Sequence, residues 1–114
     1  MLDMVASGSF KVMRGEVITK NLFKAEVRAW ATRIGVEVTA LHIRRMPRKW
    51  GSCSTAGRLT LNADLMHQSA EVRRQVIVHE LLHVKVPNHG RVFRALLRSY
   101  LSAGPPIGSS QHSR

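Results

Sequence analysis

The sequence predicts an α+β fold, in which a short antiparallel sheet packs on one central helix with two further helices. Apolar residues recur every three or four positions in three separate stretches, which is the period of an amphipathic helix. Between the first two stretches, the chain is rich in β-branched residues and alternates in polarity around a small-residue turn, which indicates strands. With 114 residues, 44% of them hydrophobic, the chain can build one core, so we expect a single domain over residues 1–102.

The first helix is expected to start after Thr19 or Asn21, either of which can cap it, and to stop at Gly35. Its apolar positions are spaced by three and four residues: Phe23, Val27, Trp30, Ala31 and Ile34. The other face is expected to meet water through charged residues: Lys24, Glu26, Arg28 and Arg33. Residues 1–20 form a weakly patterned N-terminal segment that we assign to no firm structure.

Two or three antiparallel strands are expected next. The segment VEVTALHIRRM is rich in β-branched residues, and in KWGSCSTAGRLTLN the leucines at 59 and 61 alternate with polar residues after a turn at 54–57. Trp50 is predicted to lie in the core, and Cys53 to be a small buried residue of this hairpin.

Two more helices follow the strands. Ser69 is expected to cap the second helix, which must end near Pro87 because proline has no amide hydrogen and restricts the residue before it. Asn88 is expected to cap the third helix, from residue 89 to about 102, which buries four apolar residues: Phe93, Leu96, Leu97 and Tyr100. Residues 103–114 are rich in Gly, Pro and Ser, which predicts a flexible tail.

The stretch VIVHELLHVKVPNHGRVF combines three histidines and a glutamate with the spacing of a metal site. His79 and His83 are four residues apart, so both can aim at one point from the same helix face. Glu80 is rotated by about 100° and can reach a zinc-bound water without being a ligand. After Pro87 turns the chain, His89 can supply a third ligand. One Zn²⁺ ion held this way keeps a position for water, as peptide hydrolysis requires.

A buried structural helix is the alternative interpretation of this stretch. Two apolar strips run along the same helix: Val72 with Val76, and Ile77 with Leu81 and Val84. A buried Glu80 would be costly without a charge partner, however, and a metal ion supplies one. The motif therefore favours a helix that is both buried and metal-binding. Val86 stands where metzincins have a glycine, which indicates a zincin outside that group.

Several motifs together resemble the YgjP-like zinc metallopeptidases and their SprT, Spartan and Wss-type relatives. They are KWGSCSTAGRLTLNADL, VIVHELLH and NHGRVF, between about Val38 and Tyr100. The resemblance implies zinc on His79, His83 and His89, with Glu80 as the general base. It also implies a small zincin fold in which a strand pair beside the active-site helix offers an edge to an extended protein or peptide substrate.

The chain is strongly basic, with 18 Lys and Arg against 7 Asp and Glu and a formal charge of +11, which attracts polyanions. Two groups stand out, one before the WGSC motif and one on the third helix: Arg44, Arg45, Arg48 and Lys49, and Arg91, Arg94 and Arg98. We expect both groups to flank one cleft and to bind nucleic-acid phosphates, with a merely solvated surface as the alternative. Aromatic residues make up only 5% of the chain, so base stacking is not indicated.

Other features limit the setting of the protein. A single cysteine excludes an internal disulfide framework, and neither a secretion signal nor an apolar run of membrane-spanning length is visible. We therefore expect a soluble cytoplasmic protein with no membrane partner, and the sequence leaves its oligomeric state open.

Two other functions remain compatible with the sequence: a metal-dependent ribonuclease of the YbeY type, against which Glu80 argues, and a non-catalytic basic module that zinc only stabilises. Candidates for the group that stabilises the oxyanion are Tyr100 and the nearby arginines. The tail at 103–114 could also fold back over the metal.

Overall fold

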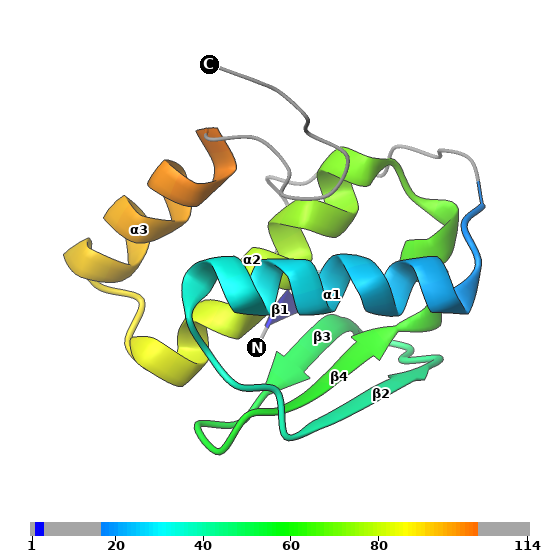
Figure 1. The fold of residues 1–114 in the computed structure, drawn as a ribbon, viewed down its shortest axis with the longest axis horizontal. Coiled ribbons are helices and arrows are strands. Elements are labelled where there is room, and N and C mark those ends of the chain that lie inside the picture. Colours follow the sequence, from blue (N-terminus) through cyan, green and yellow to red (C-terminus); the bar gives the residue numbers. More distant parts are fainter. Residues whose placement is uncertain (1, 4–16, 103–114) are drawn as a thin grey trace.

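The computed structural model describes residues 2–3 and 17–102 of the chain, and its elements are shown in Figure 1. In chain order they are β1 (Leu2–Asp3), α1 (Lys20–Ile34), β2 (Ala40–Arg44), β3 (Lys49–Cys53), β4 (Arg58–Asn62), a 3-10 helix (Ala63–His67), α2 (Ala70–Lys85) and α3 (Arg91–Ser102). The α+β prediction is confirmed. The predicted tail at 103–114 lies outside the described residues.

Helix α1 begins and ends as its sequence predicts. The Thr19 hydroxyl accepts a hydrogen bond from the amide of Leu22, and Gly35 ends the helix in the left-handed conformation with φ 85°. Glycine suits this position because it has no β-carbon to clash there. The five predicted apolar residues of the helix are all buried.

The sheet is mixed, with strand order β1-β3-β4-β2. Strands β3 and β4 form the predicted antiparallel hairpin, in which Gly51 pairs with Leu61. The antiparallel prediction is wrong for β2, which pairs with β4 in parallel, from Ala40 opposite Arg58 to Arg44 opposite Asn62. The reason is topological. Strand β4 lies between β2 and β3, and because β3 runs antiparallel to β4, β4 runs in the same direction as β2.

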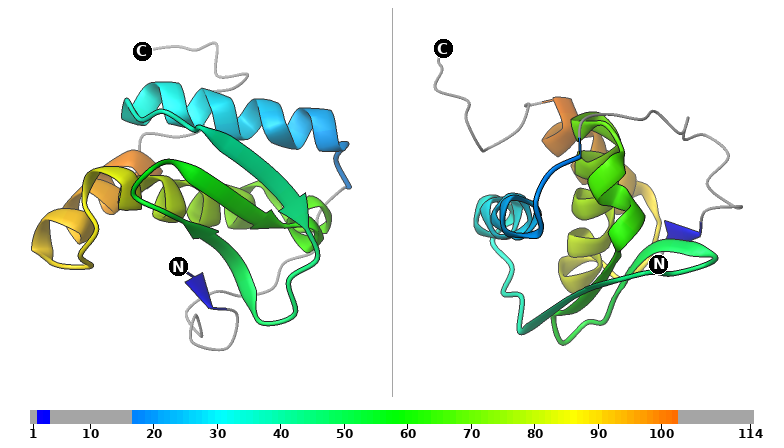
Figure 2. Two further views of the ribbon diagram at one scale, coloured as in Figure 1. Left: turned by 90° about the horizontal axis from the view of Figure 1, so that it is seen from below. Right: turned by 90° about the vertical axis from the view of Figure 1, so that its right-hand side faces the viewer.

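Helices α1 and α2 cover the same face of the sheet (Figure 2). Helix α2 contacts β1, β3 and β4, and it also packs against α1. The core lies between these layers and is built from fully buried side chains that include Phe23, Leu59, Leu61, Ile77 and Leu81. No helix among residues 17–102 is long and apolar enough to cross a lipid bilayer.

Polar contacts fix α1 against α2 near both ends of α2. Arg73 donates two hydrogen bonds to the Glu26 carboxylate, at 2.8 and 2.9 Å, and a third to the carbonyl of Gln68. At the other end, Lys85 Nζ donates to the carbonyl of Ile34 at 2.6 Å. The prediction that Glu26 only faces water is therefore wrong, because this carboxylate pairs with a buried arginine 47 positions away.

The loop between β2 and β3 is held by a buried asparagine. Asn62 is completely buried, and its side-chain amide donates to the carbonyls of Met46 and Lys49, both at 2.7 Å. Its side-chain oxygen accepts from the amide of Asp64. One residue thus fixes both sides of loop 45–48.

Candidate metal centre

Three histidines converge where α2 ends. His79 and His83 come from the last turns of α2, and His89 lies in the connection to α3. Their candidate ligand nitrogens all lie within 4.8 Å of one another. The Nε2 atom of His89 is 3.2 Å from that of His79 and 3.0 Å from that of His83. The predicted trio is therefore brought together by the fold.

These distances fit the dimensions of a metal site. With metal–nitrogen bonds of about 2.0–2.1 Å, two nitrogens of a tetrahedral centre lie about 3.4 Å apart. The two contacts of His89 are close to this value, so a small expansion would admit an ion between the three rings. Three imidazoles that leave a fourth position open are a ligand set of catalytic zinc sites.

The local electrostatics keep the rings in the form that binds metal. Burial, aided by the neighbouring histidines, lowers the pKa of His79 to about 3. Burial also lowers the pKa of His83 to about 4 and shifts that of His89 downward. The three imidazoles are thus neutral at neutral pH, as metal ligation requires.

The turn at Pro87 contributes to the site in two ways. Helix α2 ends with Val86 in an extended conformation, so the chain leaves the helix axis and returns with His89. The ring of His83 also forms a hydrogen bond with the backbone of Pro87, which can offer only its carbonyl. A backbone acceptor on the second ring nitrogen is the usual way to orient a metal-binding histidine.

Helix α3 starts two residues later than predicted. It begins at Arg91, and the carbonyl of Gly90 accepts the first helical bond from Arg94, so Asn88 is not its cap. The Arg94 side chain also donates to the carbonyl of His89 at 3.2 Å. His89 therefore lies on a short connection whose position is fixed by this hydrogen bond from α3.

Phe93 is part of the site, although sequence reasoning placed it only in the core. Its ring lies 5.2, 5.1 and 4.8 Å from those of His79, His83 and His89, measured between centroids. Phe93 is 1% exposed and so forms a dry wall behind the trio. A signal was present in the sequence, since Phe93 follows His89 by four residues on the apolar face of α3.

Glu80 is completely buried between α2 and β3. A β-carbon placed on Gly51 would lie 3.2 Å from Cγ of Glu80, so the strand backbone passes directly beside this side chain. Trp50, the preceding residue, is 4% exposed and belongs to the core as predicted.

The structure also places the other residues named from the sequence. Cys53 is half-buried in β3 and is not a member of the histidine group; burial and the charge of Glu80 raise the pKa of its thiol to about 11. Tyr100 is half-buried on α3. The two basic groups do not share one cleft, because Figures 1 and 2 place loop 45–48 at the end of the molecule away from α3.

The comparisons with known proteins agree with this architecture. The fold is similar to the crystal structure of the metallopeptidase zymogen of Methanocaldococcus jannaschii jannalysin, with a TM-score of 0.62 and 30% sequence identity. The similarity covers 68% of this chain and 80% of that one. Among curated proteins, none matches the chain.

A compact α+β domain of this shape, with three histidines gathered at the end of its central helix, is a metallopeptidase. The family model described as the YgjP-like metallopeptidase domain matches residues 15–104, and the chain belongs to this family. It is therefore a metal-dependent peptidase that acts on a protein or peptide substrate.

Proposed function

We propose that the protein is a zinc peptidase in which His79, His83 and His89 hold one Zn²⁺ ion and Glu80 is the general base. The observation that carries this proposal is the convergence of three imidazole nitrogens, at 3.0 and 3.2 Å around His89. Glu80 follows the first of these histidines and is buried on the same helix.

In the proposed reaction, the protein supplies orientation and proton transfer. When bound, zinc polarises the scissile carbonyl and lowers the pKa of the attacking water. Glu80 accepts the proton of that water as it attacks and then delivers it to the nitrogen of the departing amine. Phe93 keeps the back of the histidine trio dry, and Pro87 holds the ring of His83 in place.

The test combines metal analysis with proteolysis. After metal repletion, we expect one zinc per chain and hydrolysis of an unfolded protein substrate. Glu80→Gln should retain zinc and lose activity by a factor of about 10² to 10⁴, the usual contribution of a general base. Glu71→Gln, at an exposed glutamate in the first turn of α2, is the matched control and should remain active. Protein without stoichiometric zinc, or a fully active Glu80→Gln variant, would contradict the proposal.

The same variants decide between this activity and its alternatives. For a ribonuclease, cleavage of structured RNA should survive Glu80→Gln while proteolysis never appears. For a zinc-stabilised binding module, Glu80→Gln should leave every measurable function intact.

We also propose that the peptidase acts on proteins associated with nucleic acid. The support is the charge of +11 together with the two basic groups, which face solvent mainly through exposed arginines. The cytoplasm is the compartment we propose, because the free Cys53 suits reducing conditions.

A further inference from the structure

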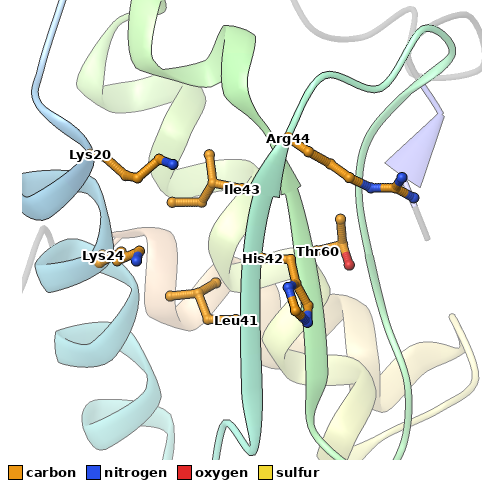
Figure 3. A pocket seen from close by; sticks show the side chains of 7 residues that line it. All are labelled: Lys20, Lys24, Leu41, His42, Ile43, Arg44 and Thr60. Atoms are coloured by element: carbon orange, nitrogen blue, oxygen red, sulfur yellow. The ribbon is translucent and has the colours of Figure 1, made fainter.

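A cavity of about 520 Å³ opens between α1 and the edge strand β2 (Figure 3). The close-up shows Lys20 and Lys24 reaching from α1 toward β2, and Leu41 and Ile43 reaching back toward the helix. Arg44 and Thr60 complete the lining together with His42. The cavity is formed by three separate parts of the chain: α1, β2 and β4.

The lining is cationic. Lys20 and Lys24 are four residues apart, so they project from the same face of α1. Arg44 adds a cation at the end of β2, with its side chain directed away from α1 (Figure 3), and none of the described lining residues is a carboxylate. Within the described part of the chain, no ion pair joins these three cations to an acid. Among the described residues no acidic side chain offsets these charges, and a bound anion would offset them.

Helix α1 adds to this positive potential. The N-terminus of a helix carries partial positive charge, and acidic residues usually occupy its first turn. The first turn of α1 holds no acidic residue and instead starts with Lys20. A lysine at this position is unfavourable because its charge has the same sign as the helix terminus. Residues that oppose the local structural preference are expected at functional sites.

The basic lining continues beyond the cavity. Arg44 also borders a second cavity, of about 260 Å³, with three further cations of loop 45–48 and the start of β3: Arg45, Arg48 and Lys49. Asn62 holds this loop by its bonds to Met46 and Lys49. The cations thus extend from α1 through Arg44 to loop 45–48. An extended row of this kind can contact several successive phosphates, whereas a single phosphate would contact only part of it.

We propose that this surface, formed by Lys20, Lys24, Arg44 and loop 45–48, binds the phosphate backbone of nucleic acid. The inference rests on the proposed association with nucleic acid and deepens it, because it assigns contact to one of the two basic groups and adds two lysines of α1. The surface lies at the end of the molecule away from α3 (Figure 1). Contact is electrostatic and independent of base sequence, since none of the described residues that line the two cavities is a Phe, Tyr or Trp.

The test measures binding of a fluorescently labelled single-stranded DNA oligonucleotide by anisotropy over a range of salt concentrations. Lys20→Ala/Arg44→Ala removes one cation from α1 and one from β2, and both side chains are exposed, so thermal unfolding should change little. We expect a loss of affinity of about tenfold at low salt. The slope of log Kobs against log salt should become shallower by about 1.4, since each lost contact to single-stranded DNA is worth about 0.7.

Two further variants make the result specific. Arg91→Ala/Arg98→Ala removes the same charge from exposed positions of α3 and should leave binding nearly unchanged. Lys20→Arg/Arg44→Lys conserves charge, and because the proposed contact depends on charge, this variant should bind like the unaltered protein.

Each other outcome overturns the assignment. If the two double-alanine variants lose affinity equally, binding depends on the net charge of the protein and not on a particular site. If only the α3 variant loses affinity, the binding site lies on α3. A poly-glutamate peptide that binds as tightly as the oligonucleotide would indicate an acidic-protein partner. If no variant binds the oligonucleotide, the proposed association with nucleic acid also fails, while the zinc-peptidase proposal stands on its own assay.

Discussion

Gly51 of β3 and Glu80 of α2 lie so close that a side chain on the glycine would meet the glutamate. A β-carbon built on Gly51 is 3.2 Å from Cγ of Glu80, 2.9 Å from Cδ2 of Leu61 and 3.2 Å from the carbonyl oxygen of Thr60. The last contact is backbone and cannot move away without disturbing the sheet. The absence of a side chain at Gly51 therefore leaves room for Glu80 beside the strand.

Gly51→Ala should displace Glu80 and weaken the protein. Overpacking of this size typically costs about 1–3 kcal/mol of stability. Misplacement of a reacting group lowers activity by about tenfold to a hundredfold. Urea unfolding and a peptidase assay at saturating zinc measure the two effects. Ser52→Ala, at the next strand position with its side chain on the other face of the sheet, is the control and should change neither quantity.

Phe93→Leu should weaken zinc binding because the wall behind the three histidines loses its ring. Groups that support metal ligands typically contribute about 10- to 100-fold to metal affinity. Competition with a zinc chelator measures this loss. Phe23→Leu alters an equally buried phenylalanine of α1 and should reduce stability alone. Equal zinc affinity in the two variants would show that Phe93 is only a core residue.

Glu26→Gln should destabilise the contact between α1 and α2. The Arg73 side chain is 6% exposed and that of Glu26 is 24% exposed, so the change leaves a buried guanidinium without its counter-charge. We expect a loss of about 2–3 kcal/mol, below the 3–5 kcal/mol of a fully buried pair because Glu26 is partly solvated. Glu37→Gln, at an exposed position, should lie within about 0.5 kcal/mol of the unaltered protein in the same unfolding experiment.

The thiol of Cys53 should react slowly below alkaline pH. Burial and the charge of Glu80 raise its pKa to about 11, so the reactive thiolate forms only as the pH rises toward that value. At pH 8, alkylation by iodoacetamide should be about a hundredfold slower than in urea-unfolded protein. Glu80→Gln removes the negative charge and should speed the reaction, whereas Glu71→Gln should not. A fast reaction at pH 8 in the folded protein would contradict this environment.

Local features of the chain could be predicted because short-range physics decides them. The caps at Thr19 and Ser69 and the stop at Gly35 follow from side-chain chemistry and backbone freedom. The approach of His79 to His83 follows from helix geometry alone. The approach of His89 depends on the turn at Pro87, whose effect could also be anticipated.

Contacts between distant segments could not be predicted in this way. Nothing near Glu26 indicates that Arg73 is its partner, and nothing in residues 36–62 indicates that β4 separates β2 from β3. The cavity of α1 and β2 likewise depends on how a helix sits beside a strand. Such arrangements are decided by the packing of the whole core and not by local pattern.

The parallel pairing of β2 with β4 has a consequence for the order of folding. Every pair in this ladder joins residues 18 positions apart, from Ala40 with Arg58 to Arg44 with Asn62. The β3–β4 hairpin closes over a much shorter loop, so the entropy of loop closure favours it as the earlier event. Strand β2 emerges from the ribosome before either of them and acquires its neighbour last. Substitutions in β2 should therefore accelerate unfolding more than they slow folding.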